Sequence, residues 1–167
     1  MRGEPDFWRF FLNRVRRDLD GGAVSAEAFG RLAAHFRDPR SWSIYEDVLE
    51  TLDGLRVRGF LLAVVSNWDS YLPELLEGLG LARRFRAVLV SAIEETGKPD
   101  PEIFRRACER LEVGPEEALH VGDSLKEDYE GARGAGLSAL LLDREDQYAG
   151  IAERIASLSE VPRRLTE

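Results

Sequence analysis

From about residue 44 onward the chain alternates between helical stripes and short apolar runs. Apolar residues recur at helical spacing over residues 48–55, which predicts a helix that stops before Gly59. The next segment, residues 60–65, reads Phe-Leu-Leu-Ala-Val-Val without interruption. A continuous apolar run of strand length, with no polar alternation, is typical of a strand buried on both faces of a parallel sheet.

The same alternation repeats to the end of the chain. Apolar runs predict three further strands at residues 87–90, 118–121 and 138–142. Helical patterns, several ended by glycine, fall at residues 72–80, 101–111, 125–135 and 149–158. Strands that alternate with helices through short connections indicate an α/β fold with a doubly wound parallel, Rossmann-like sheet and right-handed crossovers.

The N-terminal part of the chain has a different pattern. Residues 7–36 predict two helices, separated by the segment Asp18-Leu19-Asp20-Gly21-Gly22. Ser25 is a suitable N-cap for the second helix, and Asp38-Pro39 ends it. We therefore divide the chain into a helical segment, residues 1–43, and an α/β segment, residues 44–167.

Composition narrows the class of protein. The 167 residues include 23 basic and 31 acidic side chains, a net charge of −8 that disfavours nucleic acid and anionic membranes as partners. No apolar run approaches the length of a membrane helix, and the N-terminus lacks a signal-peptide pattern. Cys108 is the only cysteine, so the chain forms no intrachain disulfide. We expect a cytoplasmic protein.

Groups suited to binding an anion follow the first two predicted strands. Ligands of a doubly wound sheet bind beyond the carboxyl ends of its strands. Ser66 and Asn67 come directly after the first strand, where a hydroxyl and nearby backbone N–H groups can contact phosphate oxygens. Lys98 lies between Gly97 and Pro99, where an ammonium can neutralise phosphoryl charge. Taken singly, Ser66 also suits a helix cap and Lys98 a solvated loop.

Two carboxylates follow the third predicted strand. Asp123 comes at its end and Asp128 lies five residues further on. Magnesium takes only one or two protein carboxylates, so Asp123 can ligate it. Asp128 can orient the lysine or a metal-bound water, although both residues also suit helix caps. Since all four side chains arrive at successive ends of one parallel sheet, we predict a site for a phosphate-like anion and Mg²⁺.

Three segments resemble motifs of the haloacid dehalogenase (HAD) superfamily. They are the strand ending in Ser66-Asn67, the run from Gly97 to Phe104, and His120-Val121-Gly122-Asp123-Ser124 with Asp128. The resemblance covers residues 44 to about 145, and residues 1–43 resemble the remainder of a helical cap. It implies phosphate binding by Ser66, Asn67 and Lys98, magnesium binding by Asp123 with Asp128, and catalytic roles for Lys98 and Asp128.

The first motif of that superfamily is an apolar strand ending in Asp-x-Asp, which carries the nucleophile. The one matching sequence here, Asp18-Leu19-Asp20, follows a charged segment of helical period, so we interpret it as a helix–helix turn. By analogy the missing strand lies between the strands that end at Ser66 and Asp123, which leaves two strand edges facing a gap. We favour truncation of a longer protein. Direct pairing of the two strands in a non-catalytic form, or a strand supplied by a neighbouring chain, are the alternatives.

The resulting hypothesis is a phosphatase-type HAD hydrolase that acts on a small phosphorylated metabolite through an aspartyl-phosphate. The chain itself is expected to be inactive or impaired and to self-associate through the exposed gap. The alternatives are a non-catalytic anion-binding or interaction module and, less favoured, a 2-haloacid dehalogenase, which needs no metal ligand. Secondary candidates are His120 as packing or a donor beside the site, Trp68 at the site mouth, and an aromatic cluster around Trp8 and Phe11.

Overall fold

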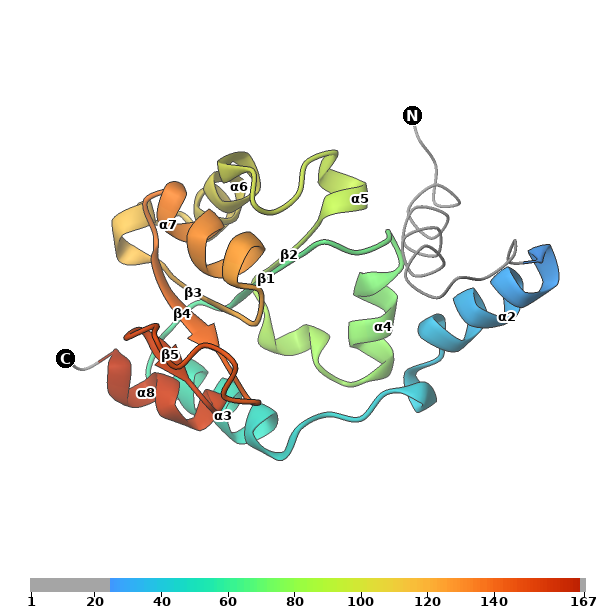
Figure 1. Ribbon diagram of the computed structural model, residues 1–167, viewed down its shortest axis with the longest axis horizontal. Coiled ribbons are helices and arrows are strands. Elements are labelled where there is room, and N and C mark those ends of the chain that lie inside the picture. Colours follow the sequence, from blue (N-terminus) through green and yellow to red (C-terminus); the bar gives the residue numbers. More distant parts are fainter. Residues whose placement is uncertain (1–24, 166–167) are drawn as a thin grey trace.

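The computed structural model describes residues 25–165, which form helices around short parallel strands (Figure 1). The strands are β1 (Ala63–Ser66), β2 (Ala87–Val90), β3 (Leu119–Gly122), β4 (Ser138–Leu142) and β5 (Arg154–Ile155). The α-helices are α2 (Ala26–Arg37), α3 (Glu46–Val57), α4 (Leu72–Gly78), α5 (Ser91–Glu94), α6 (Pro101–Leu111), α7 (Gly131–Gly134) and α8 (Val161–Arg164). A π-helical segment, Leu125–Glu130, precedes α7, and single 3₁₀ turns occupy Pro39–Ser41, Ala82–Arg84, Pro115–Glu117 and Leu158–Glu160. The α/β class predicted from the sequence is confirmed.

Local signals explain where the helices begin and end. The Ser25 side chain accepts a hydrogen bond of 3.1 Å from Ala28 N, which caps α2 as predicted. At the other end α2 stops at Arg37, and Asp38, which precedes Pro39, is its C-cap. In α6 the side chain of Asp100 caps the first turn by accepting from Glu102 N, and Pro101 holds the first helical position.

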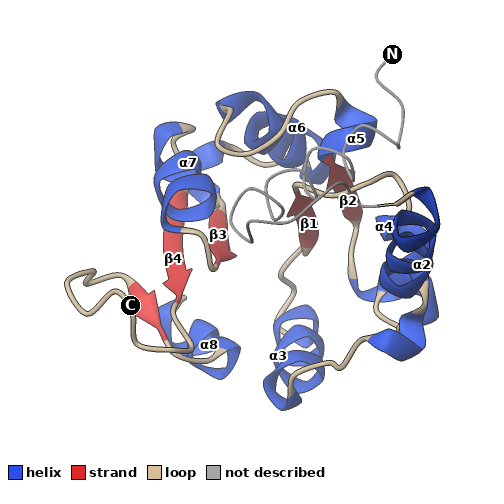
Figure 2. Cartoon of the chain, turned by 45° about the vertical axis from the view of Figure 1, so that its right-hand side comes forward, coloured by secondary structure: helices blue, strands red, loops and turns tan. Residues whose placement is uncertain are grey.

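The parallel strands form two sheets, whereas the sequence predicted one. In the described residues β1 pairs with β2, and β3, β4 and β5 form the second sheet. Figure 2 shows the pair β1–β2 lying apart from β3 and β4. Direct pairing of the strands that end at Ser66 and Gly122, one of the alternatives considered above, is therefore wrong for this structure. Within residues 25–165, β1 pairs only with β2, and β3 pairs only with β4.

Two apolar clusters lie on opposite faces of these sheets. Ala139 and Leu141 of β4 belong to a cluster with the buried residues of α6, which also packs against β1 and β2. Leu140, the residue between them, belongs to a second cluster with Leu55 of α3. Because successive side chains of a strand point to opposite faces, α6 and α3 cover opposite faces of the molecule.

The C-terminal region differs from the prediction. A closing helix over residues 149–158 was expected, but the chain there forms β5 and a 3₁₀ turn. Buried Asp143 explains the difference, since its carboxylate accepts hydrogen bonds from Gln147 N at 2.8 Å and Tyr148 N at 2.9 Å and from Arg154 Nη1 at 3.0 Å. These bonds fold the chain back so that Arg154 and Ile155 pair with the end of β4.

Aromatic rings join the α2 segment to the rest of the molecule. Trp42 lies 5.7 Å from the ring of Phe36 and 5.7 Å from that of Trp68, measured between centroids. Trp68, the candidate for the site mouth, therefore packs against the segment after α2. In Figure 1 α2 lies at the opposite end of the molecule from α8. The predicted first helix, its Trp8–Phe11 cluster and the Asp18-Leu19-Asp20 sequence lie outside the described residues.

Within residues 25–165, no helix combines the length and the hydropathy that a membrane span requires.

Candidate functional site

The Asn67 side chain connects the end of β1 to the loop that carries Lys98. Its Nδ2 donates to Lys98 O at 2.8 Å, and its Oδ1 accepts from Lys98 N at 2.8 Å. A Cβ at Gly97 would lie 2.6 Å from Asn67 Oδ1, so this approach requires glycine. The two reciprocal bonds fix the backbone of Lys98 beside the end of the strand.

The Lys98 side chain is held by a carboxylate that comes from a different part of the chain. Lys98 Nζ lies 2.5 Å from Asp128 Oδ1, and His120 Nε2 lies 2.8 Å from the same oxygen. The other carboxylate oxygen accepts a hydrogen bond of 3.0 Å from Ser124 N. The side chains of Lys98 and Asp128 are only 11% and 4% exposed, so little water screens the pair.

The charge state of Asp128 follows from these contacts. Burial by itself would raise the pKa of Asp128, because it disfavours the ionised form. The hydrogen bond from His120, together with the charge and hydrogen bond of Lys98, outweighs burial and lowers the pKa well below its usual range. Asp128 is therefore an anion at neutral pH and a partner for the Lys98 ammonium.

Gly122, the last residue of β3, allows Asp128 to approach the strand. A Cβ at Gly122 would overlap the carboxyl group of Asp128 and lie 2.6 Å from its Cβ. The π-helical segment that carries Asp128 therefore depends on glycine at this point.

Ser66 and Asp123 offer free polar groups at the same ends of the strands. Ser66 is half-buried at the end of β1, and Asp123 is exposed directly after β3. Within the described residues, neither side chain forms a hydrogen bond or an ion pair with its neighbours. A hydroxyl and a carboxylate are thus available to a ligand beside the Lys98–Asp128 pair.

The donor set fits a hard cation with a mostly aqueous coordination shell. Residues 25–165 contain no group of three or more His, Cys, Asp or Glu side chains that could enclose a metal. Magnesium needs no such cage, since it keeps several waters and binds one or two carboxylates. The free carboxylate of Asp123 suits that role. Both oxygens of Asp128 already accept hydrogen bonds, which suits a role in holding Lys98.

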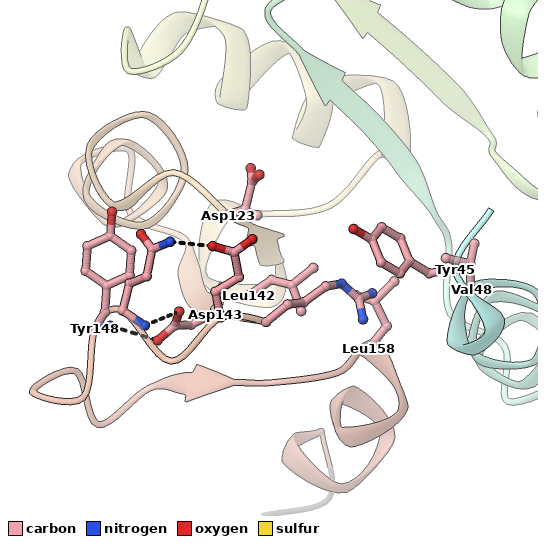
Figure 3. Close-up of a pocket in the computed structure, with 11 residues that line it drawn as sticks. Tyr45, Val48, Asp123, Leu142, Asp143, Tyr148 and Leu158 are labelled. Carbon is pink, nitrogen blue, oxygen red and sulfur yellow. Dashed lines mark hydrogen bonds between the residues drawn. The ribbon is translucent and has the colours of Figure 1, made fainter. Parts of the chain in front are cut away.

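A pocket of about 480 Å³ lies next to Asp123, between the start of α3 and the ends of β3 and β4 (Figure 3). Tyr45 and Arg144 line it and stack on one another, with the guanidinium 4.2 Å from the ring centroid. Asp47 pairs with Arg144 at 2.9 Å. In Figure 3 the Asp123 side chain points away from Asp143 and Tyr148. Asp123 therefore stands at the rim of this pocket.

Several residues of the site were missed by sequence reasoning. Glu127 accepts a hydrogen bond of 3.1 Å from Asn67 Nδ2, which links the ends of β1 and β3. The Ser91 hydroxyl accepts from Trp68 N at 3.1 Å and thereby ties the chain after β1 to the end of β2. Ser91 could have been found from its position directly after the apolar run at residues 87–90. No sequence signal distinguishes Glu127 from other exposed acidic residues. His120 was considered as a donor beside the site, and its contact with Asp128 fits that role.

The chain matches known proteins along most of its length. A family model described as haloacid dehalogenase-like hydrolase matches residues 1–136. The phosphoserine phosphatase of Thermus thermophilus is 39% identical over 158 residues, which cover 90% of this chain and 64% of that protein. The chain spans about half the length of other curated relatives that it matches.

Solved structures agree in fold. The HAD phosphatase from Thermococcus onnurineus superposes with a TM-score of 0.74 at 31% identity, covering 92% of this chain and 69% of that one. The 2-haloacid dehalogenase from Pseudomonas syringae superposes with a TM-score of 0.68 at 32% identity, covering 88% and 65%.

Proposed function

Since the chain belongs to the haloacid dehalogenase-like hydrolase family, we propose that it forms the phosphate-binding part of a Mg²⁺-dependent phosphomonoester hydrolase. The observation that carries the proposal is the Lys98 ammonium held by the buried carboxylate of Asp128. Ser66 ends β1 and Asp123 directly follows β3, and within the described residues neither side chain has a hydrogen-bond partner. A cation, a hydroxyl and a metal-binding carboxylate at one edge are what a phosphoryl group requires.

Each residue has a distinct part in this proposal. The Ser66 hydroxyl and the chain around Asn67 bind phosphoryl oxygens, and Lys98 neutralises the charge that develops on them. Asp128 acts through Lys98 by holding its ammonium in place, and His120 contacts the same oxygen of Asp128. Because the Lys98–Asp128 ion pair is almost fully buried, the ammonium of Lys98 is held in position before a ligand binds.

The proposed metal is Mg²⁺, with Asp123 as its ligand and Asp128 in the surrounding shell. When bound, magnesium supplies positive charge to the phosphoryl oxygens. Asp123 contributes the carboxylate, and its exposure leaves room for the waters that this ion retains.

The nucleophile of the proposed reaction is a carboxylate that residues 25–165 do not supply, since no Asp-x-Asp sequence occurs among them. In the proposed reaction that carboxylate attacks phosphorus, the ester P–O bond breaks and the alcohol leaves with a proton. Water then hydrolyses the resulting aspartyl-phosphate to orthophosphate and the free carboxylate. By itself this chain is proposed to be inactive or impaired, because the described residues lack that carboxylate. Its substrate class is a small phosphorylated metabolite, and its compartment is the cytoplasm.

The lack of a nucleophile among the described residues also favours a second candidate, a non-catalytic module that binds anions at the same residues. Dehalogenase chemistry is the third candidate, because the Pseudomonas syringae structure that superposes on this chain is a 2-haloacid dehalogenase. A requirement for Mg²⁺ would exclude it, because halide displacement by a carboxylate needs no metal ligand at Asp123.

The test measures hydrolysis of p-nitrophenyl phosphate and binding of orthophosphate by the full chain, with Mg²⁺ and with chelator. We expect orthophosphate binding without appreciable turnover, and a loss of affinity of about tenfold or more in Lys98→Met, as befits a charged hydrogen bond. Lys126→Met is the matched control, because Lys126 is the other lysine of the chain and is exposed.

Two results would change the proposal. Mg²⁺-dependent turnover that disappears in Asp123→Asn would show that a nucleophile lies within this chain, with Asp18 as the residue to substitute next. Absence of orthophosphate binding, or equal binding by Lys98→Met and the wild type, would overturn the assignment of the site.

A further inference from the structure

The pocket beside Asp123 adjoins the residues that hold Lys98. Gly122, the last residue of β3, lines this pocket. The same glycine faces Asp128, because a Cβ at Gly122 would overlap the Asp128 carboxyl group. That carboxylate holds the Lys98 ammonium. A ligand with its phosphoryl group at Lys98 can therefore place the rest of its atoms in the pocket.

The walls of the pocket suit the carbon skeleton of a small alcohol. Its volume of about 480 Å³ lies within the range of roughly 300–1,000 Å³ that small-molecule sites usually have. Val48, Leu142 and Leu158 form an apolar part of the lining, and Tyr45 adds an aromatic ring (Figure 3). Small-molecule sites generally present apolar walls with a few polar groups among them. The pocket is therefore large enough for a molecule of about the size of a sugar.

Polar groups that lack protein partners also line the pocket. The Arg144 side chain contacts Asp47 through Nη2, and within residues 25–165 its Nε and Nη1 donate to no acceptor. Glu145 Oε2 accepts a hydrogen bond of 2.7 Å from Gln147 Nε2, which leaves the other Glu145 oxygen and Gln147 Oε1 as acceptors in that part of the chain. The pocket thus offers both donors and acceptors. A hydroxyl group matches such a mixture, because it can donate one hydrogen bond and accept others.

Charge limits which hydroxylated molecules the pocket accepts. Of the charged side chains that line it, Asp143 is paired with Arg154 at 3.0 Å, and Arg144 is balanced by its carboxylate partner on α3. Among the described residues Asp123 and Glu145 form no ion pair, and a magnesium ion at Asp123 would oppose the first of these two charges. The Glu145 carboxylate is then left as a negative charge without a partner. Like charges repel at close range, so a second anionic group on the ligand is disfavoured here.

We propose that this pocket binds the alcohol part of the phosphorylated substrate, and that this alcohol is an uncharged polyol of about the size of a sugar. The inference rests on the proposed function, which places the phosphoryl group at Lys98. Arg144 donates to hydroxyl groups of the polyol, Gln147 accepts from them, and the apolar side chains contact its carbon atoms. Glu145 accepts from a hydroxyl group and repels a carboxylate in the same place, so this residue determines specificity.

The test measures binding of three phosphate esters to the full chain by calorimetry in the presence of Mg²⁺. Glucose 1-phosphate carries an uncharged polyol. Glucuronic acid 1-phosphate has the same ring with a carboxylate in place of the CH₂OH group, and cyclohexyl phosphate has a ring of the same size without hydroxyl groups. Orthophosphate, measured alongside with each protein variant, reports the phosphoryl site alone.

We expect glucose 1-phosphate to bind about tenfold more tightly than either of the other esters. Glu145→Gln should reduce its advantage over the glucuronic acid ester to about twofold, because the variant removes the charge and keeps an acceptor. Gln147→Leu should reduce its advantage over cyclohexyl phosphate, because an acceptor for a hydroxyl group is lost. Glu109→Gln is the matched control and should keep both ratios, since Glu109 lies on α6 and outside the pocket. All three substituted residues are exposed, so their replacement leaves the core intact.

Failure of this inference is distinguishable from failure of the proposed function. Equal affinity for the three esters, tighter binding of the glucuronic acid ester, or an unchanged ratio in Glu145→Gln would overturn the inference. Orthophosphate binding that still depends on Lys98 would leave the proposed function intact in that case. If the esters bound with the expected dependence on Glu145 while Lys98→Met changed no affinity, the pocket assignment would stand and the phosphate site at Lys98 would be wrong. Failure of the wild type to bind any of these phosphates would overturn both proposals.

Discussion

At the scale of single residues, the site is organised by contacts that exclude larger or uncharged side chains. Lys98 is held at its backbone by Asn67 and at its ammonium by Asp128. A buried charge that loses its partner is costly, so the members of this network depend on one another. The glycines at positions 97 and 122 belong to it, because each leaves space that a neighbouring polar side chain fills.

We expect Gly122→Ala to destabilise the protein and to weaken orthophosphate binding. The added methyl group would overlap the Asp128 carboxyl group, and forced displacement of packed groups costs typically about 1–3 kcal/mol. Gly134→Ala is the matched control, because a Cβ there meets no atom within 4 Å. Urea unfolding of both variants measures the difference. A Gly122→Ala variant with wild-type stability and binding would show that Asp128 does not need this space.

At the scale of elements, α6 connects the two sheets. Its stripe of Ile103, Phe104, Ala107 and Cys108 is buried, and Phe104 contacts the His120 ring of β3. The helix itself packs on β1 and β2. Because the two sheets do not pair with one another in the part of the chain that the structure describes, we expect the packing of α6 to contribute much of the stability that a continuous sheet would provide.

Phe104→Ala should therefore cost about 3–5 kcal/mol of unfolding free energy, the usual range for a fully buried phenylalanine. The side chain is 0% exposed. The adjacent exposed residue provides a control, and Arg105→Ala should stay within about 0.5 kcal/mol of the wild type. Calorimetric or denaturant unfolding distinguishes the two. If Phe104→Ala lowered the unfolding free energy by less than about 1 kcal/mol, far below that range, α6 would not hold the sheets together.

Asp143 organises the turn between β4 and β5. Burial alone would raise the pKa of Asp143, but hydrogen bonds from the Tyr148 and Gln147 backbones and from Arg154 lower it. A carboxyl whose pKa is lower in the folded protein than in the unfolded chain stabilises the fold above its unfolded value of about 3.9. That stabilisation is lost as the pH falls through the folded value.

We accordingly expect Asp143→Asn to lower the thermal midpoint at pH 7 and to differ little from the wild type at strongly acidic pH. The physical reason is that protonated Asp143 and asparagine both lack the charge that pairs with Arg154. Thermal unfolding followed across the acid range checks the convergence of the two curves. A constant offset at every pH would mean that the carboxylate charge contributes nothing.

At the scale of the whole molecule, the charge balance limits the partners. The net charge is −8, and 21 of the 23 basic residues are arginines, many of them paired with acidic neighbours, such as Arg84 with Asp53 and Arg110 with Glu94. Pairing of this kind leaves little unopposed positive surface for a polyanion.

A fluorescently labelled DNA duplex should not bind the protein, even near 10 mM salt, where screening is weakest. Fluorescence anisotropy measures this directly, and binding that decreases with salt would contradict the expectation. Titration with p-nitrophenyl phosphate in the same buffer tests whether a small anion can still reach Lys98.

Local patterns were sufficient to predict most elements. The residues of β2, β4 and α6 lie where the apolar runs and the Pro101 start signal placed them. The prediction that Ser66, Lys98, Asp123 and Asp128 share one edge rests on the rule that parallel strands bring their carboxyl ends together. Of these four side chains, the structure places Lys98 and Asp128 in direct contact. Helix caps, apolar runs of strand length and strand ends depend on residues that are close in sequence. For that reason they could be predicted from the sequence.

Contacts between distant residues were decided only by the tertiary structure. The sequence by itself determined the α/β class and the main alternation of helices and strands from α3 to β4. Only the fold decided that His120 shares Asp128 with Lys98 and that residues 154–155 form a strand through Asp143. It also decided that, among the described residues, β1 and β3 belong to separate sheets. Hydrogen bonds between residues far apart in sequence, and the pairing of strand edges, depend on which segments lie side by side in the folded protein. A local pattern of side chains does not determine that arrangement.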